Sequence, residues 1–238
     1  MTKKIKTVIL CGGVGTRMKE ETEFKPKPLV KVGDEPILSH IMKIYAHFGY
    51  KEFILTLGYK GEMIKTYFET NPHDFKIHAV DTGQESLTGE RVLRVGHLIN
   101  EDNFMVTYGD GVADIDINKL IDFHERQGTV GTISGVHPYA KYGLIYKDSK
   151  NLAKSFLQKP RMKEYVSGGF MVFKKEVLNY LNNGNIEDCF SKLIEERQLS
   201  IYEHDGFWKA MDTYKEMEEL NELWRTQRPW ALWDNKIL

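Results

Sequence analysis

The segment TVILCGGVGTR, residues 7–17, joins an unbroken apolar run to a cluster of glycines. Residues 7–11 are apolar or β-branched, which is typical of a strand that is buried on both faces in a parallel sheet. The glycines that follow predict a tight turn in which backbone N–H groups can converge on an anion, because no Cβ blocks the approach. The segment therefore predicts an α/β fold, with either a phosphate-binding loop or a plain tight turn after the first strand.

Two common phosphate-binding motifs do not fit this turn. A P-loop ends in Gly-Lys-Ser or Gly-Lys-Thr, whereas here Gly15 is followed by Thr16 and Arg17. A dinucleotide fingerprint has a third glycine where this chain has Met18. We therefore expect a different phosphate cradle, in which the planar guanidinium of Arg17 can face a pyrophosphate group.

Buried strands and amphipathic helices alternate through the first half of the chain. Apolar runs predict strands at 53–57, 76–80 and 104–108, and apolar side chains at helical spacing predict helices at 36–45 and 62–68. This order is typical of an α/β fold with right-handed crossovers. Beyond Gly128 we expect short strands at 129–136, 143–146, 155–157 and 169–173 and helices at 174–182 and 186–196.

Composition excludes several classes of protein. The 238 residues carry 33 Lys or Arg against 34 Asp or Glu, a net charge of −1, which is unlike a protein that coats a nucleic-acid backbone. No apolar run approaches the roughly 18 residues that a membrane span requires, and no signal-peptide pattern is present. Two cysteines, Cys11 and Cys189, are too few for a disulfide framework or a zinc site. We therefore expect a cytoplasmic protein that binds neither membranes nor nucleic acid.

The near-neutral total conceals two poles of opposite charge. Residues 1–31 hold eight Lys or Arg against three Glu, whereas residues 185–220 hold ten Asp or Glu against four Lys or Arg. Within the basic pole, Pro26 and Pro28 restrict the backbone on both sides of Lys27, which lowers the cost of aiming its ammonium group. Lys27 is therefore a candidate phosphate ligand, and a solvated basic loop is the alternative.

A series of motifs in a fixed order resembles the sugar-1-phosphate nucleotidylyltransferase family. Beside the glycine-rich turn, these motifs are Pro26-Lys27-Pro28, Tyr108-Gly109-Asp110-Gly111, Lys159-Pro160, Gly168-Gly169-Phe170 and Met211-Asp212-Thr213. Segments 58–61, 81–83, 86–91 and 205–208 resemble the glucose-1-phosphate cytidylyltransferase branch in particular. The resemblance extends over nearly the whole chain.

The resemblance implies both a fold and a reaction. The fold is a Rossmann-like, three-layer α/β/α nucleotidyltransferase fold, similar to glycosyltransferase A, with a mixed, mainly parallel central sheet. Residues 1–238 then form a single domain, with a nucleotide-binding lobe at 1–128 and an acceptor-binding lobe at 129–238. In the reaction, CMP passes from CTP to a small phosphorylated acceptor, and the CDP-linked product serves surface polysaccharide synthesis.

The resemblance also assigns roles to particular residues. Arg17, Lys27 and Asp110 are the expected catalytic residues, and Asp110 and Asp212 are the expected ligands of Mg²⁺, which prefers hard oxygen donors. From the residues alone, Asp110 could equally serve the turn and Asp212 could cap the helix that follows it. The expected nucleotide-binding residues are Leu10, Cys11, Gly12, Gly13, Gly15, Thr16, Arg17, Lys27, Ser86, Thr88, Gly89, Arg91 and Gly109, and the expected acceptor-binding residues are Gly143, Gln158, Lys159, Ser167, Gly168 and Gly169.

Departures from the family pattern fall on the acceptor side. Gln158 replaces the glutamate of Glu-Lys-Pro, and Ser167 replaces the asparagine of Asn-Gly-Gly-Phe. An amide in place of a carboxylate changes which hydroxyl groups a site can bind. The acceptor is therefore left open between glucose 1-phosphate, another sugar phosphate and a different phosphate or phosphonate. Two further alternatives are an enzyme that uses another nucleoside triphosphate as donor and a non-catalytic nucleotide-sensing module. Separately, the aromatic residues near the C-terminus lead us to expect a homo-oligomer.

Overall fold

A seven-stranded mixed sheet forms the centre of the molecule in the computed structural model, which describes residues 4–234 except the side chain of Glu20. The strand order is β12-β8-β11-β6-β1-β4-β5. β11 runs antiparallel to β6 and β8, whereas the other neighbouring pairs are parallel. The strands are β1 (Thr7–Leu10), β4 (Glu52–Leu57), β5 (Lys76–Asp81), β6 (Asn103–Tyr108), β8 (Gly131–Val136), β11 (Val166–Lys174) and β12 (Leu199–His204).

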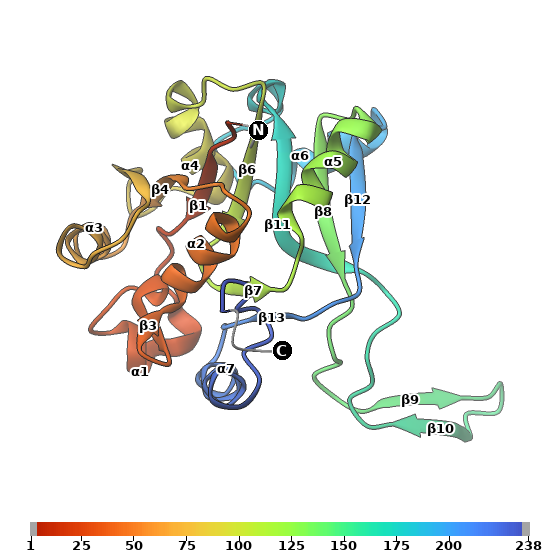
Figure 1. Ribbon diagram of the computed structural model, residues 1–238. Coiled ribbons are helices and arrows are strands. Elements are labelled where there is room, and N and C mark those ends of the chain that lie inside the picture. The colour runs from red at the N-terminus through yellow and green to blue at the C-terminus, as the bar shows by residue number, and fades with distance from the viewer. Residues whose placement is uncertain (1–3, 235–238) are drawn as a thin grey trace.

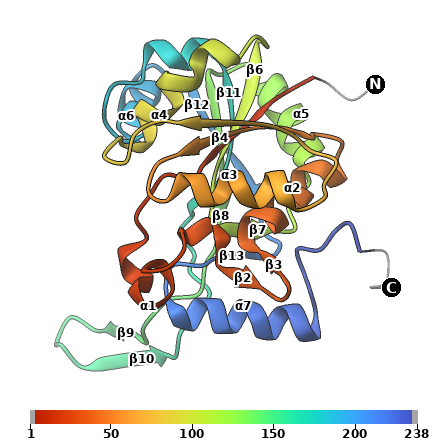
Figure 2. The ribbon, with the colours of Figure 1, turned by 90° about the vertical axis from the view of Figure 1, so that its left-hand side faces the viewer.

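Helices cover both faces of this sheet. On one face, α2 (Ile37–His47), α3 (Gly61–Thr70) and α5 (Ile117–Gln127) bury apolar side chains in one core cluster. On the other face, α4 (Thr88–Val95) and α6 (Asp188–Glu195) contribute to a second core cluster. Figure 2 shows α2 and α3 on the opposite side of the sheet from α4 and α6. The predicted three-layer α/β/α fold with a mainly parallel mixed sheet is thus confirmed.

The remaining helices are short or lie at the edge of the molecule. α7 (Tyr214–Thr226) packs beside the small ribbon of β2 (Lys31–Val32) and β3 (Glu35–Pro36), as Figure 2 shows. α1 (Lys19–Thr22) directly follows the first of the four 3₁₀ helices within residues 4–234, which are η1 (Thr16–Met18), η2 (Lys27–Leu29), η3 (Gly96–Leu98) and η4 (Lys175–Asn179). The helix predicted over 174–182 is thus wrong in extent, because β11 continues to Lys174, which pairs with Asn103, and only a 3₁₀ segment follows.

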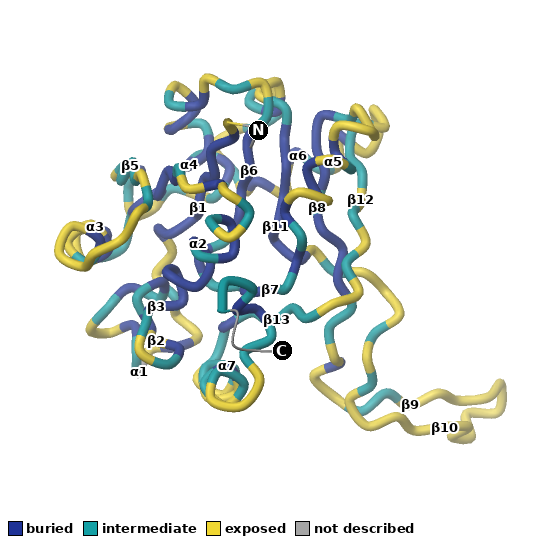
Figure 3. Tube along the Cα trace, viewed as in Figure 1, coloured by how far each residue is buried: buried dark blue, intermediate teal, exposed yellow. Residues whose placement is uncertain are grey.

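Two further pairs of strands lie outside the main sheet. β7 (Gly111–Ala113) and β13 (Trp208–Ala210) form a short antiparallel ribbon. β9 (Leu144–Lys147) and β10 (Ala153–Leu157) form a hairpin that extends away from the body (Figure 1). Figure 3 shows that this hairpin is mostly exposed along its length. Within residues 4–234, no helix is long and apolar enough to cross a membrane.

Candidate active site

A pocket of about 450 Å³ opens where β1 and β6 end. In open α/β sheets, ligands bind beyond the carboxyl ends of the strands, which is the position of this pocket. Its walls come from the glycine-rich turn, from the loop at Lys27 and Pro28, from the segment that leads into α4 and from the end of β6, with Asn185 and Asp212 added from later in the chain. The lining residues are Leu10, Cys11, Gly12, Gly13, Gly15, Thr16, Arg17, Lys27, Pro28, Gln84, Glu85, Ser86, Leu87, Thr88, Arg91, Tyr108, Gly109, Asp110, Asn185 and Asp212.

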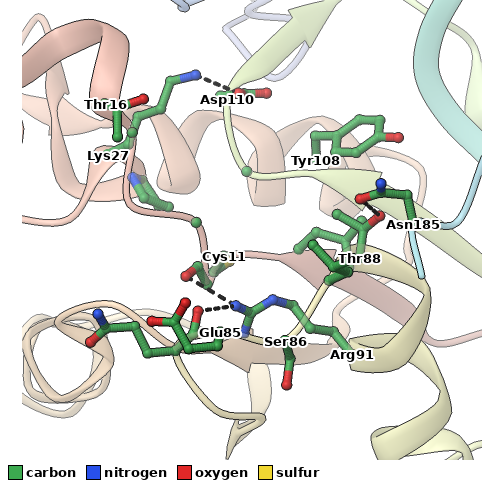
Figure 4. A pocket seen from close by; sticks show the side chains of 18 of the residues that line it. Cys11, Thr16, Lys27, Glu85, Ser86, Thr88, Arg91, Tyr108, Asp110 and Asn185 are labelled. Carbon is green, nitrogen blue, oxygen red and sulfur yellow. Dashed lines mark hydrogen bonds and ion pairs between the residues drawn. The ribbon is translucent and has the colours of Figure 1, made fainter. Parts of the chain in front are cut away.

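Almost all the residues predicted to bind the nucleotide line this one pocket. Figure 4 shows Lys27 and Asp110 at one side of it and Ser86 and Arg91 at the opposite side. Gly89 lies just outside the lining, where its N–H group donates to the carbonyl oxygen of Gly184 at 3.0 Å. The structure therefore brings together residues that are more than 70 positions apart in the chain, as expected for a binding site that several strands build.

Lys27 lies between two carboxylates at one end of the pocket. Its Nζ atom donates to Asp110 Oδ2 at 2.6 Å and to Asp212 Oδ1 at 2.9 Å. Arg17 donates from Nη2 to the same Oδ1 atom of Asp212 at 2.7 Å. Two cations and two carboxylates thus form one connected cluster, with the side chain of Lys27 only 12% exposed.

The charges of this cluster shift the pKa values of its members in opposite directions. Burial alone lowers the pKa of Lys27, but the carboxylates of Asp110 and Asp212 outweigh burial and raise it. Burial alone raises the pKa of Asp212, but Lys27 and Arg17 outweigh it and lower the pKa. Lys27 and Asp212 therefore both keep their charges at neutral pH.

The β7–β13 ribbon explains how Asp110 and Asp212 meet. Asp110 directly precedes β7, Asp212 follows β13 by two residues, and Ala210 pairs with Gly111 across the ribbon. The N–H group of Met211 also donates to the carbonyl oxygen of Asp110 at 2.9 Å. Two carboxylates from distant parts of the chain are therefore held at the same end of this ribbon.

The start of α7 leaves the carboxylate of Asp212 available to the site. The side chain of Thr213, one residue later, caps the helix by accepting from the N–H group of Glu216. The N–H group of Asp212, the residue before the cap, donates to Glu216 Oε2 at 2.8 Å, so the side chain of Glu216 also holds the backbone that leads into the helix. The alternative in which Asp212 itself caps the helix is therefore wrong.

Comparison with known proteins decides the family. The model of the family described as nucleotidyl transferase matches residues 6–226. The chain belongs to the nucleotidyl transferase family. The family predicted from the motifs is thereby confirmed.

Relatives described as glucose-1-phosphate cytidylyltransferases match this nucleotidyl transferase over nearly its whole length. A probable glucose-1-phosphate cytidylyltransferase of Bacillus subtilis is 38% identical, over 96% of this chain and 100% of that protein. The glucose-1-phosphate cytidylyltransferase of Salmonella typhi is 37% identical, over 97% of this chain and 100% of that protein. The crystal structure of a UDP-glucose pyrophosphorylase complexed with UDP-glucose has the same fold, with a TM-score of 0.75 and 15% identity over 95% of this chain and 100% of that one.

Cys11, one of two buried cysteines, is the one that lies at the pocket. Cys11 lines the pocket but is only 1% exposed, and burial raises the pKa of its thiol well above the usual value. Because the thiolate is the reactive form, Cys11 is inert and packs as a small apolar residue. It contributes shape rather than chemistry to the pocket.

The predicted acceptor residues lie outside the pocket lining, in two groups. Gly168 and Gly169 belong to β11 beside the pocket: Gly168 accepts from Trp208 Nε1 at 2.7 Å, and a Cβ on Gly169 would lie 2.7 Å from Cδ2 of Tyr108. Ser167 precedes them on the same strand. Gly143, Gln158 and Lys159 instead lie at the base of the β9–β10 hairpin. The acceptor roles of all six residues stay predictions.

Sequence reasoning missed several residues that form the side wall of the pocket. Tyr108 donates its hydroxyl hydrogen to the Glu187 carboxylate, and burial together with this carboxylate raises the pKa of the tyrosine. Asn185 faces Thr88, at 3.5 Å between Oδ1 and Oγ1 (Figure 4). Tyr108 belongs to the motif Tyr108-Gly109-Asp110-Gly111, which could indicate its place in the site, whereas no motif marks Asn185 or Glu187 as pocket residues.

Proposed function

We propose that this nucleotidyl transferase transfers CMP from CTP to a sugar 1-phosphate, giving a CDP-sugar and pyrophosphate. The observation that carries the proposal is the cluster of Arg17, Lys27, Asp110 and Asp212 at the mouth of a pocket lined by a glycine-rich turn. The full-length relatives named as glucose-1-phosphate cytidylyltransferases support both the donor and the acceptor.

The chemistry of the reaction matches the groups in the pocket. A phosphate monoester is largely a dianion at pH 7, so the acceptor oxygen can attack the α-phosphorus without a general base. The bond from the α-phosphorus to the bridging oxygen breaks, and pyrophosphate leaves with the electron pair. Lys27 and Arg17 would hold the phosphate oxygens in line and neutralise their charge, which is the main contribution that a protein makes to phosphoryl and nucleotidyl transfer.

The two carboxylates fit a divalent metal ion. Both Asp110 and Asp212 reach the single ammonium group of Lys27, so they converge on a point where a cation is stabilised. Mg²⁺ is usually held by one or two carboxylates together with phosphate oxygens. Nucleotidyltransferases of this family commonly use a divalent metal. We infer that Asp110 and Asp212 bind Mg²⁺, which supplies further neutralisation of the triphosphate when bound.

The base of the donor would contact the segment 84–88, which lies across the pocket from Lys27. This segment lies within the stretch 81–91, which contains two of the motifs that resemble the cytidylyltransferase branch, and CTP is therefore the proposed donor. The acceptor is proposed as a sugar 1-phosphate rather than glucose 1-phosphate alone, because Gln158 departs from the family pattern. Cytoplasmic location and homo-oligomer formation complete the proposal.

A donor and acceptor panel tests this function. Purified protein with Mg²⁺ is incubated with CTP, UTP, dTTP, GTP or ATP, each with glucose 1-phosphate or another sugar phosphate, and the products are identified by mass spectrometry. We expect a CDP-sugar as the main product. A different nucleotide in the product would replace CTP as donor, and the absence of product from every pair would favour a nucleotide-sensing module instead.

A further inference from the structure

Arg91 on α4 is a charged residue buried in the floor of the pocket. Only 3% of its surface is exposed, although it lines the pocket. Its Nη1 atom donates to the carbonyl oxygen of Leu57 at 2.9 Å and to Thr82 Oγ1 at 2.7 Å. Its Nη2 atom donates to the carbonyl oxygens of Gly12 at 3.2 Å and of Gln84 at 3.1 Å (Figure 4).

These four bonds join three segments of the chain: the glycine-rich turn, the end of β4 and the connection between β5 and α4. Gly12 belongs to the glycine-rich turn, Leu57 ends β4, Thr82 follows β5, and Gln84 opens the segment expected to contact the base. Each terminal nitrogen of a guanidinium carries two hydrogens, so the protein uses all four of them. The terminal nitrogens of Arg91 consequently have no hydrogen left for a nucleotide in this arrangement.

Two glycines provide the space for the guanidinium. A Cβ on Gly12 would lie 2.0 Å from Nη1 of Arg91, and a Cβ on Gly58 would lie 2.8 Å from the same atom. Any side chain at either position would push the guanidinium out of its place. The glycine-rich turn therefore serves a close approach of Arg91 as well as the approach of an anion.

Among the described residues, no carboxylate lies within ion-pair distance of the guanidinium, although Glu90 and Asp81 act on its charge from further away. Its acceptors are three carbonyl oxygens and a hydroxyl. A buried charge without a partner is costly, and a folded protein retains it where a ligand or a structural need compensates. The anionic triphosphate expected in this pocket would supply that compensation.

We propose that Arg91 is a positioning residue that fixes the glycine-rich turn against the base-contacting segment, so that the triphosphate end and the base end of the donor bind to a preformed site. The inference rests on the proposed function, because it concerns the same pocket and the same donor. It differs from direct recognition of the base by Arg91, in which the guanidinium would bind the nucleotide itself.

The binding of inorganic tripolyphosphate distinguishes the two roles, because this probe has no base. Calorimetry would compare tripolyphosphate and CTP binding to the wild-type protein, to Arg91→Lys and to the control Arg94→Lys, whose arginine lies on the same helix but is exposed and pairs with Glu90. We expect Arg91→Lys to weaken both ligands by roughly tenfold and by the same factor, and Arg94→Lys to leave both affinities unchanged. Loss of CTP affinity with unchanged tripolyphosphate affinity would overturn the proposal in favour of direct base contact, and unchanged affinity for both would leave Arg91 only a role in stability.

A second variant keeps the proposal testable if Arg91→Lys does not fold. Thr82→Val removes one acceptor of Arg91 without changing charge or shape greatly, and should weaken both ligands equally, by about twofold to fivefold. Unchanged affinities in Thr82→Val would contradict the proposal.

Failure of the wild-type protein to bind tripolyphosphate would also contradict a preformed phosphate site. Failure of every donor in the product panel, with tripolyphosphate binding still dependent on Arg91, would overturn the proposed reaction but not the role of Arg91.

Discussion

Lys27 is the residue that connects the two halves of the site. Its ammonium group bridges Asp110, at the end of β6, and Asp212, at the start of α7. Pro26, before it, has extended backbone, and Pro28, after it, belongs to the same 3₁₀ turn as Lys27. The sequence indicates that the backbone around Lys27 is restricted. The pairing of Lys27 with both carboxylates depends on the β7–β13 ribbon, which no local sequence pattern predicts.

Replacing Lys27 by alanine should abolish most of the activity without unfolding the protein. We expect turnover to fall by at least about 100-fold, because a contact that stabilises charge in the transition state is lost. Steady-state turnover and circular dichroism measure the two effects. Lys25→Ala is the control, since Lys25 lies in the same loop but pairs with Glu21 at 2.8 Å, and near-normal turnover in Lys27→Ala would refute the assignment.

A buried histidine far from the site should govern part of the pH dependence of stability. His124 is 1% exposed, its Nδ1 atom bonds Thr132 Oγ1 at 2.9 Å, and its Nε2 atom has no hydrogen-bond partner among the described residues. Burial, with the nearby Lys174, lowers the pKa of His124 to about 4. Between about pH 6.5 and 4 the folded protein therefore binds fewer protons than the unfolded chain, so stability falls as the pH falls through this range.

The variant His124→Asn should make stability less sensitive to acid. The slope of unfolding free energy against pH should decrease by up to about 1.4 kcal/mol per pH unit in this range. Urea unfolding at several pH values between 4.5 and 7 gives the slope, with His47→Asn, at an exposed position on α2, as the control. An unchanged slope in His124→Asn would show that this histidine does not titrate as proposed.

At the scale of elements, long and continuous patterns were predictable and short pairings were not. The apolar runs of β1, β4 and β6 and the amphipathic α2 stand where the sequence predicts them, because each follows a regular burial pattern. β7 and β13 contain three residues each and pair across almost 100 positions, so no periodicity could reveal them. The convergence of the two carboxylates therefore came from the family resemblance and not from local pattern.

The packing of the β2–β3 turn against α7 should not tolerate a methyl group added at Gly33. Gly33 has φ 64°, its N–H group donates to Asn221 Oδ1 at 2.8 Å, and a Cβ there would lie 2.2 Å from Nε1 of Trp224. Gly128 has a similar φ of 68° but open space around it. Alanine at either glycine therefore costs the energy of a left-handed backbone at a residue with a Cβ, and only Gly33→Ala also places that Cβ in steric overlap with Trp224.

We expect Gly33→Ala to lose about 1–3 kcal/mol more unfolding free energy than Gly128→Ala. Chemical denaturation of the two variants beside the wild-type protein measures the difference. Equal losses would mean that Trp224 moves aside freely and that the turn does not depend on close packing with α7.

At the scale of the whole molecule, the β9–β10 hairpin stands apart from both core clusters. The sequence predicted both of its strands but not their departure from the body, because strand patterns do not show which strands join the main sheet. Ile145 and Phe156 are 68% and 60% exposed, although both are large apolar residues. The division into a nucleotide-binding lobe and an acceptor-binding lobe, with Gln158 and Lys159 at the base of this hairpin, stays a prediction.

Shortening the hairpin should leave the donor site and the fold intact. Leu144 pairs with Leu157, so residues 145–156 can be replaced by Asn-Gly, which closes a two-residue turn between them. We expect a single cooperative unfolding transition and CTP affinity within about twofold of the wild-type protein, because the removed residues lie outside the pocket and the core clusters. A tenfold loss of CTP affinity would show that the hairpin contributes to donor binding.

Acceptor-dependent release of pyrophosphate from CTP tests the central claim most directly. Pyrophosphate release by the wild-type protein and by Asp110→Asn would be measured in the presence of Mg²⁺ and CTP. Each protein would be assayed once with glucose 1-phosphate as the acceptor and once without it. The account predicts release that requires the acceptor and that falls by at least about 100-fold in a folded Asp110→Asn variant. Pyrophosphate release that is independent of the acceptor, or equal in the wild-type protein and Asp110→Asn, would contradict it.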